Sequence, residues 1–399
     1  MDSDLAGVPG GIYIHIPFCR RKCRYCDFYS TTDLSLKSAF LNALEREIKM
    51  TDSRSLKFDS LYIGGGTPTV LDADDIYRII ETVGRYFNVL PGAELTLEVN
   101  PGTVTLDEFR FYKKGGINRL SIGVQSFNDS HLQFLGRIHT ASEAVDCVLR
   151  ARQAGFDNVG LDLIYGLPGQ DLTAWRGDLI QAVNLAPEHL SCYMLACEGG
   201  TPLAQDVRNG SVHMPPDDLL CDLLGLTAGF LTANGFSHYE ISNFARKTED
   251  ESKPVASRHN QKYWSFAPYI GLGPAAHSFI EPMRYWNTSD INTYISETEA
   301  GRLPLAEEET LTTEQLIIES IYLGLRKISG IDLLWFNLRY GLDFHSTFKQ
   351  VIEELTAGGL ITISETHCAL SHKGLAMLDS VAAMFTNQEF GALSPPNDS

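Results

Sequence analysis

The stretch that decides the fold reads Tyr13-Ile-His-Ile-Pro-Phe-Cys19-Arg-Arg-Lys-Cys23-Arg-Tyr-Cys26, an apolar run followed by a loop with three cysteines. Three thiols spaced this closely on a loop can converge on one metal centre, because no helix or strand holds them apart. The basic residues between them favour thiolates, the form that binds metal. We therefore predict a metal centre with three ligands, Cys19, Cys23 and Cys26, directly after the first strand.

Around this loop, between residue 11 and about residue 236, short β-branched runs alternate with amphipathic stretches. Such alternation is typical of βα units around a parallel sheet. The expected strands are Gly11–Ile16, Ser60–Ile63, Glu94–Val99, Arg119–Val124, Asn158–Ile164 and Leu190–Leu195. The expected helices are Leu36–Met50, Ala73–Phe87, Leu106–Lys114, Ala141–Ala154 and Leu172–Asn184. The pattern predicts an α/β fold, a partial (βα)6 TIM-like barrel whose chemistry gathers after the carboxyl ends of the strands.

The remainder of the chain has a different composition. Residues 237–300 form an aromatic-rich region, which we interpret as a connection, and 301–386 predict a smaller, mainly helical C-terminal domain. Residues 387–399, which include Pro395 and Pro396, predict a disordered tail. The barrel is therefore expected to span 11–236.

Composition excludes several classes of protein. The chain has 399 residues, 44% of them hydrophobic, and no apolar run approaches the roughly 18 residues of a membrane helix. The net charge of −18 argues against a nucleic-acid partner. Eight scattered cysteines do not make a disulfide scaffold, and the first ten residues lack the features of a secretory signal. We expect a cytoplasmic protein.

Two metals fit the cysteine loop on spacing alone. Three ligands leave a coordination position open, whereas His15 would complete a closed Cys3His zinc site. The zinc alternative predicts a zinc-stabilised binding module.

The C-x3-C-x2-C spacing, with Tyr25 before the third cysteine, resembles the radical S-adenosylmethionine (SAM) superfamily. The stretch from Tyr13 to Phe28 is similar to the oxygen-independent coproporphyrinogen III oxidase family, and the resemblance extends over most of the chain. It implies that the three thiolates bind a [4Fe-4S] cluster, whose fourth iron takes the amino and carboxylate groups of S-adenosylmethionine. Reduction, by a donor such as a flavodoxin or ferredoxin, would then yield a 5'-deoxyadenosyl radical.

Further motifs follow the other strands. Glycines after the second strand let a ligand approach the backbone, a carboxylate in the apolar run around Asp162 needs a partner, and Arg137 offers a bidentate fork for a carboxylate. By the resemblance, the residues that contact S-adenosylmethionine are Tyr13, Tyr25, Gly65, Gly66, Thr67, Glu98, Gln125, Arg137, Asp162, Ile164 and Gly166.

The chain departs from the oxidases of this family at two places. Phe28 stands where the oxidases carry a fourth cysteine, and the twelve residues before Tyr13 are too few for their N-terminal extension. Both departures resemble a branch described as haem chaperones. That branch carries an H-N-x-x-Y-W motif proposed for haem binding, present here as His259, Tyr263 and Trp264. Imidazole is a common haem ligand and aromatic rings stack on a macrocycle.

Two hypotheses follow from the resemblance. The first is a haem chaperone that binds the cluster, S-adenosylmethionine and haem and transfers haem to an acceptor protein. The alternative is an oxygen-independent coproporphyrinogen III oxidase, so whether the chain is an enzyme stays open. The chain departs from that branch at Ala275, where a glycine is usual, and in a charged loop before His259. Five other residues are therefore alternative haem ligands or plain core residues, namely Cys192, Cys197, Cys221, His139 and His277.

Overall fold

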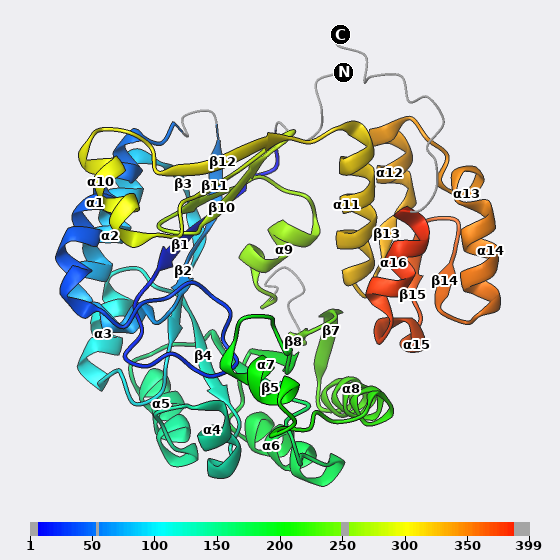
Figure 1. Ribbon diagram of the computed structural model, residues 1–399, viewed down its shortest axis with the longest axis horizontal. Helices are drawn as coiled ribbons and strands as arrows, with labels where there is room; N and C mark the ends of the chain where they lie inside the picture. The colour runs from blue at the N-terminus through cyan, green and yellow to red at the C-terminus, as the bar shows by residue number, and fades with distance from the viewer. Residues whose placement is uncertain (1–6, 53–55, 249–254, 387–399) are drawn as a thin grey trace.

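The computed structural model describes residues 7–52, 56–248 and 255–386. A curved twelve-stranded sheet has the order β12-β11-β10-β9-β1-β2-β3-β4-β5-β6-β8-β7. Six consecutive strands at its centre are parallel and form the partial barrel of Figure 1: β1 (Gly10–Ile16), β2 (Lys57–Gly65), β3 (Asn88–Val99), β4 (Arg119–Gln125), β5 (Val159–Tyr165) and β6 (His189–Met194). The expected partial (βα)6 barrel is confirmed.

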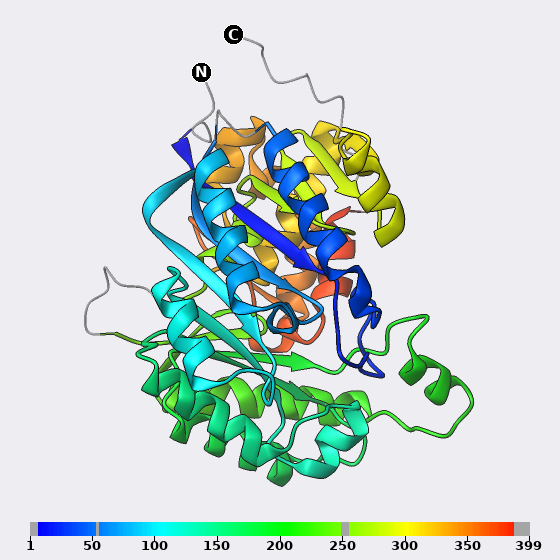
Figure 2. The same cartoon turned by 90° about the vertical axis from the view of Figure 1, so that its left-hand side faces the viewer.

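Helices cover the convex face of the sheet, as Figures 1 and 2 show. They are α1 (Lys37–Met50), α2 (Ala73–Tyr86), α3 (Leu106–Lys114), α4 (Asp129–Leu135), α5 (Ala141–Gln153), α6 (Leu172–Asn184) and α8 (Asp217–Ala233). The helix α7 (Pro202–Arg208) lies instead beside the cysteine loop, where the Leu203 N–H donates to the Arg24 carbonyl at 2.9 Å. The short 3-10 helices η2 (Leu34–Leu36) and η3 (Pro68–Val70) lie in the first two βα connections. Capping boxes at Thr105 and Thr140 begin α3 and α5 by satisfying free backbone N–H groups. The core between sheet and helices is apolar, with Ile12, Ile14 and Ile16 of β1 fully buried.

The sheet continues beyond the barrel at both edges. β9 (Tyr269–Leu272) pairs parallel to β1 and is followed by the antiparallel β10 (His277–Ile280), β11 (Met283–Asn287) and β12 (Leu305–Thr310). At the other edge β8 (Asn243–Arg246) and β7 (Phe236–Glu240) pair antiparallel. Residues 237–300, expected as a connection, therefore build both edges of the main sheet. Strands of four or five residues carry too short a pattern to predict, because distant neighbours decide their pairing.

One helix lies on the concave side of the barrel. α9 (Arg258–Trp264) packs against β1 and β2. Its first backbone N–H groups, those of Arg258 and His259, donate to the Glu94 carboxylate of β3, each at 3.1 Å. A carboxylate there satisfies unpaired donors and faces the positive end of the helix. The H-N-x-x-Y-W motif is thereby fixed inside the barrel.

The C-terminal region packs around a core of its own, beginning after α10 (Ile291–Glu299), which lies on α1. Its helices are α11 (Thr313–Arg326), α12 (Leu333–Tyr340), α13 (Phe344–Thr347), α14 (Lys349–Ala357), α15 (His372–Leu375) and α16 (Leu378–Thr386). A small sheet joins them, with the order β13 (Ile331–Asp332), β15 (His367–Leu370), β14 (Ile361–Ile363). The expected helical C-terminal region is confirmed, with this sheet as an addition; the predicted tail at 387–399 lies outside the described residues.

None of the helices in the described ranges is long and apolar enough to cross a membrane.

Candidate functional site

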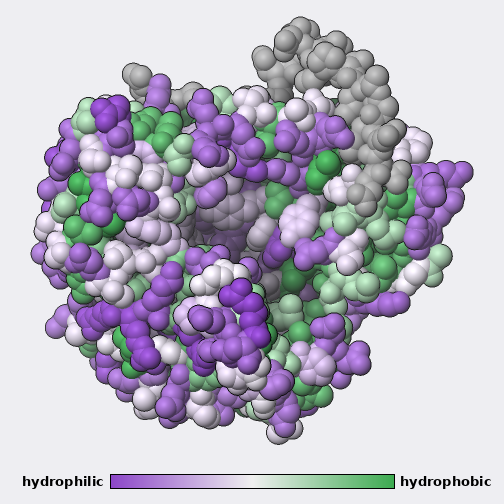
Figure 3. All heavy atoms as spheres, in the orientation of Figure 1, coloured by the Kyte–Doolittle hydropathy of each residue, from purple (hydrophilic) through white to green (hydrophobic). Residues whose placement is uncertain are grey.

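A cavity of about 480 Å³ opens at the carboxyl ends of the parallel strands and extends into the barrel. The hollow is visible at the centre of Figure 3. All three cysteines of the loop line the cavity. So do nine of the residues expected to contact S-adenosylmethionine, namely Tyr25, Gly65, Gly66, Thr67, Glu98, Gln125, Arg137, Asp162 and Ile164. The barrel thus collects side chains from five strands and the cysteine loop at one place.

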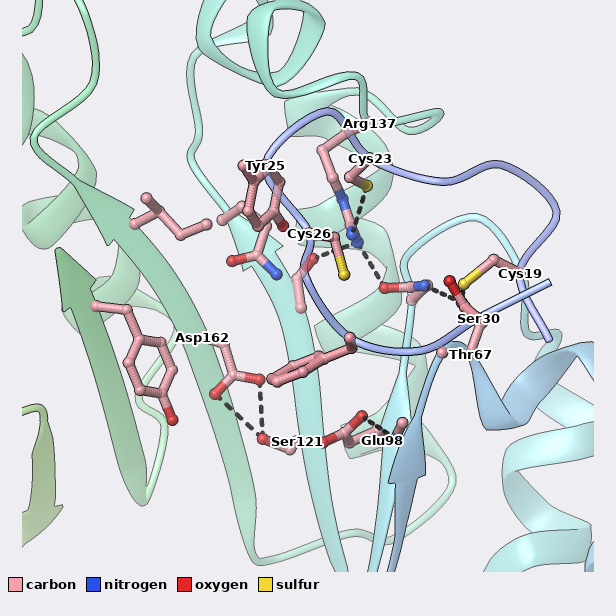
Figure 4. A pocket seen from close by; sticks show the side chains of 18 of the residues that line it. Cys19, Cys23, Tyr25, Cys26, Ser30, Thr67, Glu98, Ser121, Arg137 and Asp162 are labelled. Atoms are coloured by element: carbon pink, nitrogen blue, oxygen red, sulfur yellow. Dashed lines mark hydrogen bonds between the residues drawn. The ribbon is translucent and has the colours of Figure 1, made fainter. Parts of the chain in front are cut away.

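The cysteine loop follows β1 and is anchored at both ends. The Cys19 N–H donates to the Thr31 carbonyl at 2.9 Å, and Arg24 pairs with Asp206 of α7. The Sγ of Cys19 lies 3.6 Å from the Thr67 hydroxyl. Burial raises the pKa of the Cys26 thiol, so this thiol needs a positive partner to ionise. Figure 4 shows the three cysteine side chains around the upper part of the cavity, above Glu98, Ser121 and Asp162.

The glycines after β2 bring the backbone close to the thiols. A Cβ atom on Gly66 would lie 2.7 Å from the Phe18 carbonyl oxygen and 3.0 Å from the Cys19 Sγ, so any larger residue would displace the loop. Gly65 has a φ of +114°, which L-residues rarely adopt. Gly66 therefore requires glycine because of the thiol loop, and Gly65 because of its own backbone conformation. A three-thiol cradle of this kind fits an iron–sulfur cluster.

The structure does not bring His15 to the thiols. Its Nε2 bonds the Tyr29 carbonyl at 2.9 Å, its Nδ1 bonds the Tyr13 hydroxyl at 3.1 Å, and its side chain does not line the cavity. In the described part of the chain, no three histidine, cysteine or carboxylate side chains are grouped to hold a single metal ion. The Cys3His zinc site therefore lacks its fourth ligand.

Two buried carboxylates face the cavity from β3 and β5, the strands on either side of β4. Glu98 of β3 accepts hydrogen bonds from the Tyr62 hydroxyl at 2.8 Å and the Gly65 N–H at 3.2 Å. Burial raises the pKa of Glu98 to about 7, against the pull of these two donors. Burial also raises the pKa of Asp162 on β5, which accepts from the Ser121 hydroxyl at 2.9 Å. A cationic or hydroxyl-bearing ligand would meet acceptors that lack a full complement of protein donors.

Arg137 connects the thiol loop to the strand ends. Its guanidinium donates to the Asn100 Oδ1 at 2.5 Å, to the Gly123 carbonyl at 3.0 Å and to the Cys23 Sγ at 3.6 Å. Asn100 in turn donates to the Thr67 hydroxyl at 2.7 Å. A buried cation placed among thiols favours their ionised form and can hold a ligand carboxylate.

Two of the expected contact residues do not reach the cavity wall. Tyr13 bonds His15, and burial raises the pKa of its phenol. Gly166 donates its N–H to the Gln170 side chain at 2.8 Å, and a Cβ there would meet Leu220 at 2.8 Å. Both positions are filled by protein contacts. A role for them in cofactor binding remains a prediction.

Sequence reasoning missed several residues that line the cavity: Tyr62, Asn100, Ser121, Ser191 and Tyr193. Asn100 stands in the Glu-Val-Asn-Pro segment already singled out, so its position carried a signal. Ser121 and Ser191 are polar residues in apolar strands, and this pattern marks a polar cavity wall once the strands are placed.

The H-N-x-x-Y-W motif lies deeper than the thiols. His259 is 1% exposed; its Nδ1 bonds the Ser60 hydroxyl at 3.1 Å and its Nε2 bonds the Tyr263 hydroxyl at 2.9 Å. Burial lowers the pKa of His259 to about 3, so the ring is neutral. Tyr263 and Trp264 line a second cavity of about 640 Å³ between the sheet edge and α11 and α16. Both imidazole nitrogens are therefore occupied by protein groups, and iron would reach either one only after α9 or its partners shift.

The five residues considered as alternative haem ligands do not lie together in the structure. Cys192 is buried in β6, and His139 bonds the Val124 carbonyl at 3.2 Å. His277 stacks on Trp286 with ring centres 5.4 Å apart, while Cys197 and Cys221 are exposed. All eight cysteines, each within the described ranges, are free. None of these five residues lines the first cavity together with the loop thiols.

The sequence and the fold are similar to those of known proteins. Residues 13–178 match the radical SAM superfamily model, and residues 311–377 match the HemN C-terminal domain. The chain is 34% identical to "Heme chaperone HemW" of Bacillus subtilis, over 94% of this chain and 99% of that protein. It is 33% identical to the protein of the same name from Mycobacterium tuberculosis, over 95% of each.

The chain belongs to the HemW family. The solved structure of coproporphyrinogen III oxidase (HemN) from Escherichia coli matches 96% of this HemW-family chain and 91% of its own length, with a TM-score of 0.81 and 25% identity. The radical SAM fold implies a [4Fe-4S] cluster and S-adenosylmethionine. The cavity has the donors for both: three thiols on one loop, and buried acceptors beneath them.

Proposed function

We propose that this protein is a haem chaperone that binds a [4Fe-4S] cluster, S-adenosylmethionine and haem, and transfers haem to an acceptor protein. The observation that carries the proposal is the 34% identity, along almost the whole chain, to a relative named as a haem chaperone. The substitution of Phe28 for the oxidases' fourth cysteine supports the same reading. We place the protein in the cytoplasm, with a flavodoxin or ferredoxin as the electron donor and no nucleic-acid partner.

Each group at the cavity has a proposed role. Cys19, Cys23 and Cys26 hold the cluster, which with S-adenosylmethionine supplies one-electron chemistry when bound. Glu98 accepts the ligand's amino group, Arg137 holds its carboxylate, and Asp162 accepts from the ribose hydroxyls. Tyr13, Tyr25, Gly65, Gly66, Thr67, Gln125, Ile164 and Gly166 are proposed to shape the rest of the binding surface.

The haem function is tested by titrating the cluster-reconstituted protein with ferric haem and following the Soret band. We expect saturable binding by the wild type. If His259 ligates the iron, His259→Ala weakens binding at least about tenfold, whereas Tyr263→Phe, which frees the Nε2 of His259, leaves it unchanged or tighter. Equal affinities in all three proteins would remove His259, and with it the motif, from the haem site.

Coproporphyrinogen III oxidation is the second candidate, because the solved HemN structure matches the chain closely. Anaerobic incubation of the reduced, reconstituted protein with coproporphyrinogen III and S-adenosylmethionine tests it. We expect no vinyl-bearing product by chromatography. Formation of protoporphyrinogen IX by a protein that binds no haem would replace the chaperone proposal with the oxidase.

A further inference from the structure

Three large apolar side chains with no role in the proposed cofactor site stand exposed on the first cavity. Phe28, Ile138 and Met194 are 69%, 52% and 50% exposed, and all three line the cavity. They come from separate parts of the chain: the cysteine loop, the connection between α4 and α5, and the end of β6. Exposed apolar side chains that line one cavity indicate a binding surface, because a ligand that covers them removes apolar area from water.

Three basic side chains lie on the rim of the first cavity, as do the three apolar side chains Phe28, Ile138 and Met194. Arg20, Arg21 and Lys22 are exposed, line the cavity, and have no carboxylate within ion-pair distance among the residues that the structure describes. Arg24 of the same loop differs, since it pairs with Asp206. Two exposed carboxylates, Asp27 and Glu198, also line the cavity, so the basic part of its rim is the segment of residues 20–22, in a chain whose net charge is −18. Unpaired cations beside an apolar surface fit a ligand that has an apolar body and acidic groups.

We propose that this rim is the haem-docking surface, with the macrocycle on Phe28, Ile138 and Met194 and the propionates on Arg20, Arg21 and Lys22. The proposal rests on the haem function proposed above and adds where the haem lies. A neutral apolar ligand would leave the cations unused. An acidic protein would leave the apolar groups unused and would be repelled by the rest of the chain.

Phe28 gives the proposal its sharpest prediction. An aromatic ring that is 69% exposed can stack on a flat macrocycle without any change in the fold. Both ring nitrogens of His259 are already hydrogen-bonded within the protein. Haem that binds on the rim, away from α9, does not require these hydrogen bonds to break. Haem on the rim would lie next to the cysteine loop.

The test is a haem titration of the full, cluster-reconstituted chain, read by the Soret band, with iron content measured on every sample. We expect Phe28→Ser, and separately Ile138→Ser, to weaken haem binding about tenfold or more, since each removes apolar contact area. The matched control is Leu338→Ser, which removes a 76% exposed apolar residue on α12 and should bind as the wild type does. Ile138→Ser lies outside the cysteine loop, so it keeps the test valid if Phe28→Ser loses iron.

The cations are tested with a second ligand. Arg20→Glu/Arg21→Glu should weaken binding of haem but not of haem dimethyl ester, whose propionates carry no charge. If the wild type binds haem and all the rim variants bind it with the same affinity, the docking surface is overturned but the haem function is not. Wild type that binds no haem would overturn both. A loss of haem binding confined to the charge variant, with Phe28→Ser and Ile138→Ser unchanged, would keep the propionate contacts and overturn the macrocycle's place on the apolar side chains.

Discussion

At the scale of single residues, Glu98 predicts how cofactor binding responds to pH. Burial raises its pKa to about 7, so the carboxyl is mostly protonated at pH 6 and mostly ionised at pH 8. The ionised carboxylate accepts a hydrogen bond from the ligand's amino N–H more strongly than the neutral carboxyl does, and S-adenosylmethionine should therefore bind about tenfold more tightly at pH 8 than at pH 6. Equilibrium dialysis of the reconstituted protein measures this affinity.

Glu98→Gln should bind S-adenosylmethionine weakly and without this pH dependence. The control Glu81→Gln, on the surface of α2, should match the wild type in both respects. If the pH dependence survives in Glu98→Gln, another group causes it.

The same scale shows what sequence can and cannot predict about a site. Asp162 stood out as a carboxylate in an apolar strand, and it does face the cavity. Its partner Ser121 was not predictable, because the contact joins strands 41 positions apart in sequence. His259 is the clearest case: its partner Tyr263 follows from helical spacing, but Ser60 lies 199 positions away. Only the folded chain shows that both nitrogens are bonded.

At the scale of elements, Glu47 of α1 ties the added sheet edge to the barrel. Its carboxylate accepts from the Gly273 N–H at 2.8 Å after β9, from Asn287 of β11 at 2.5 Å and from the Tyr294 hydroxyl of α10 at 2.5 Å. Burial nevertheless raises its pKa to about 7. The folded state then holds a proton that the unfolded state releases near pH 4.5, so this group lowers the free energy of unfolding as pH rises from about 4.5 to 7, by up to about 3 kcal/mol.

Glu47→Gln should remove that dependence. Urea unfolding, followed by circular dichroism at pH 5, 6 and 7.5, should give a flatter profile for the variant than for the wild type, provided that the amide keeps the Tyr294 contact. A matched control is Glu81→Gln on α2, which is exposed and should leave the profile unchanged. Identical pH profiles for wild type and Glu47→Gln would mean that Glu47 ionises normally in the folded protein.

The elements also explain where prediction from sequence ends. The expected βα elements repeat one pattern, and most came within three residues of their observed bounds; β4, expected at Arg119–Val124, ends one residue later. The exception is β3, expected from Glu94, which begins six residues earlier at Asn88. β12 has almost no buried residue, so Leu305–Thr310 carries no alternation to detect. It is a strand because β11 supplies its hydrogen bonds. Pairing between distant antiparallel edges is set by the fold and leaves little trace in composition.

At the scale of the whole molecule, the two metal hypotheses predict different consequences of removing the metal. A structural zinc site contributes folding energy, so its loss unfolds the module that depends on it. Here Cys19, Cys23 and Cys26 lie outside the main hydrophobic core, which is formed by the sheet and its helices.

Protein reconstituted under argon should be brown, with about four irons and no zinc per chain. Cys23→Ser should lose the iron, the colour and S-adenosylmethionine binding, yet keep the far-UV circular dichroism and a thermal midpoint within a few degrees of the iron-free wild type. A colourless protein with one zinc, unfolded by a chelator, would show instead that the loop is a structural metal site and would remove the basis for cofactor binding in the barrel.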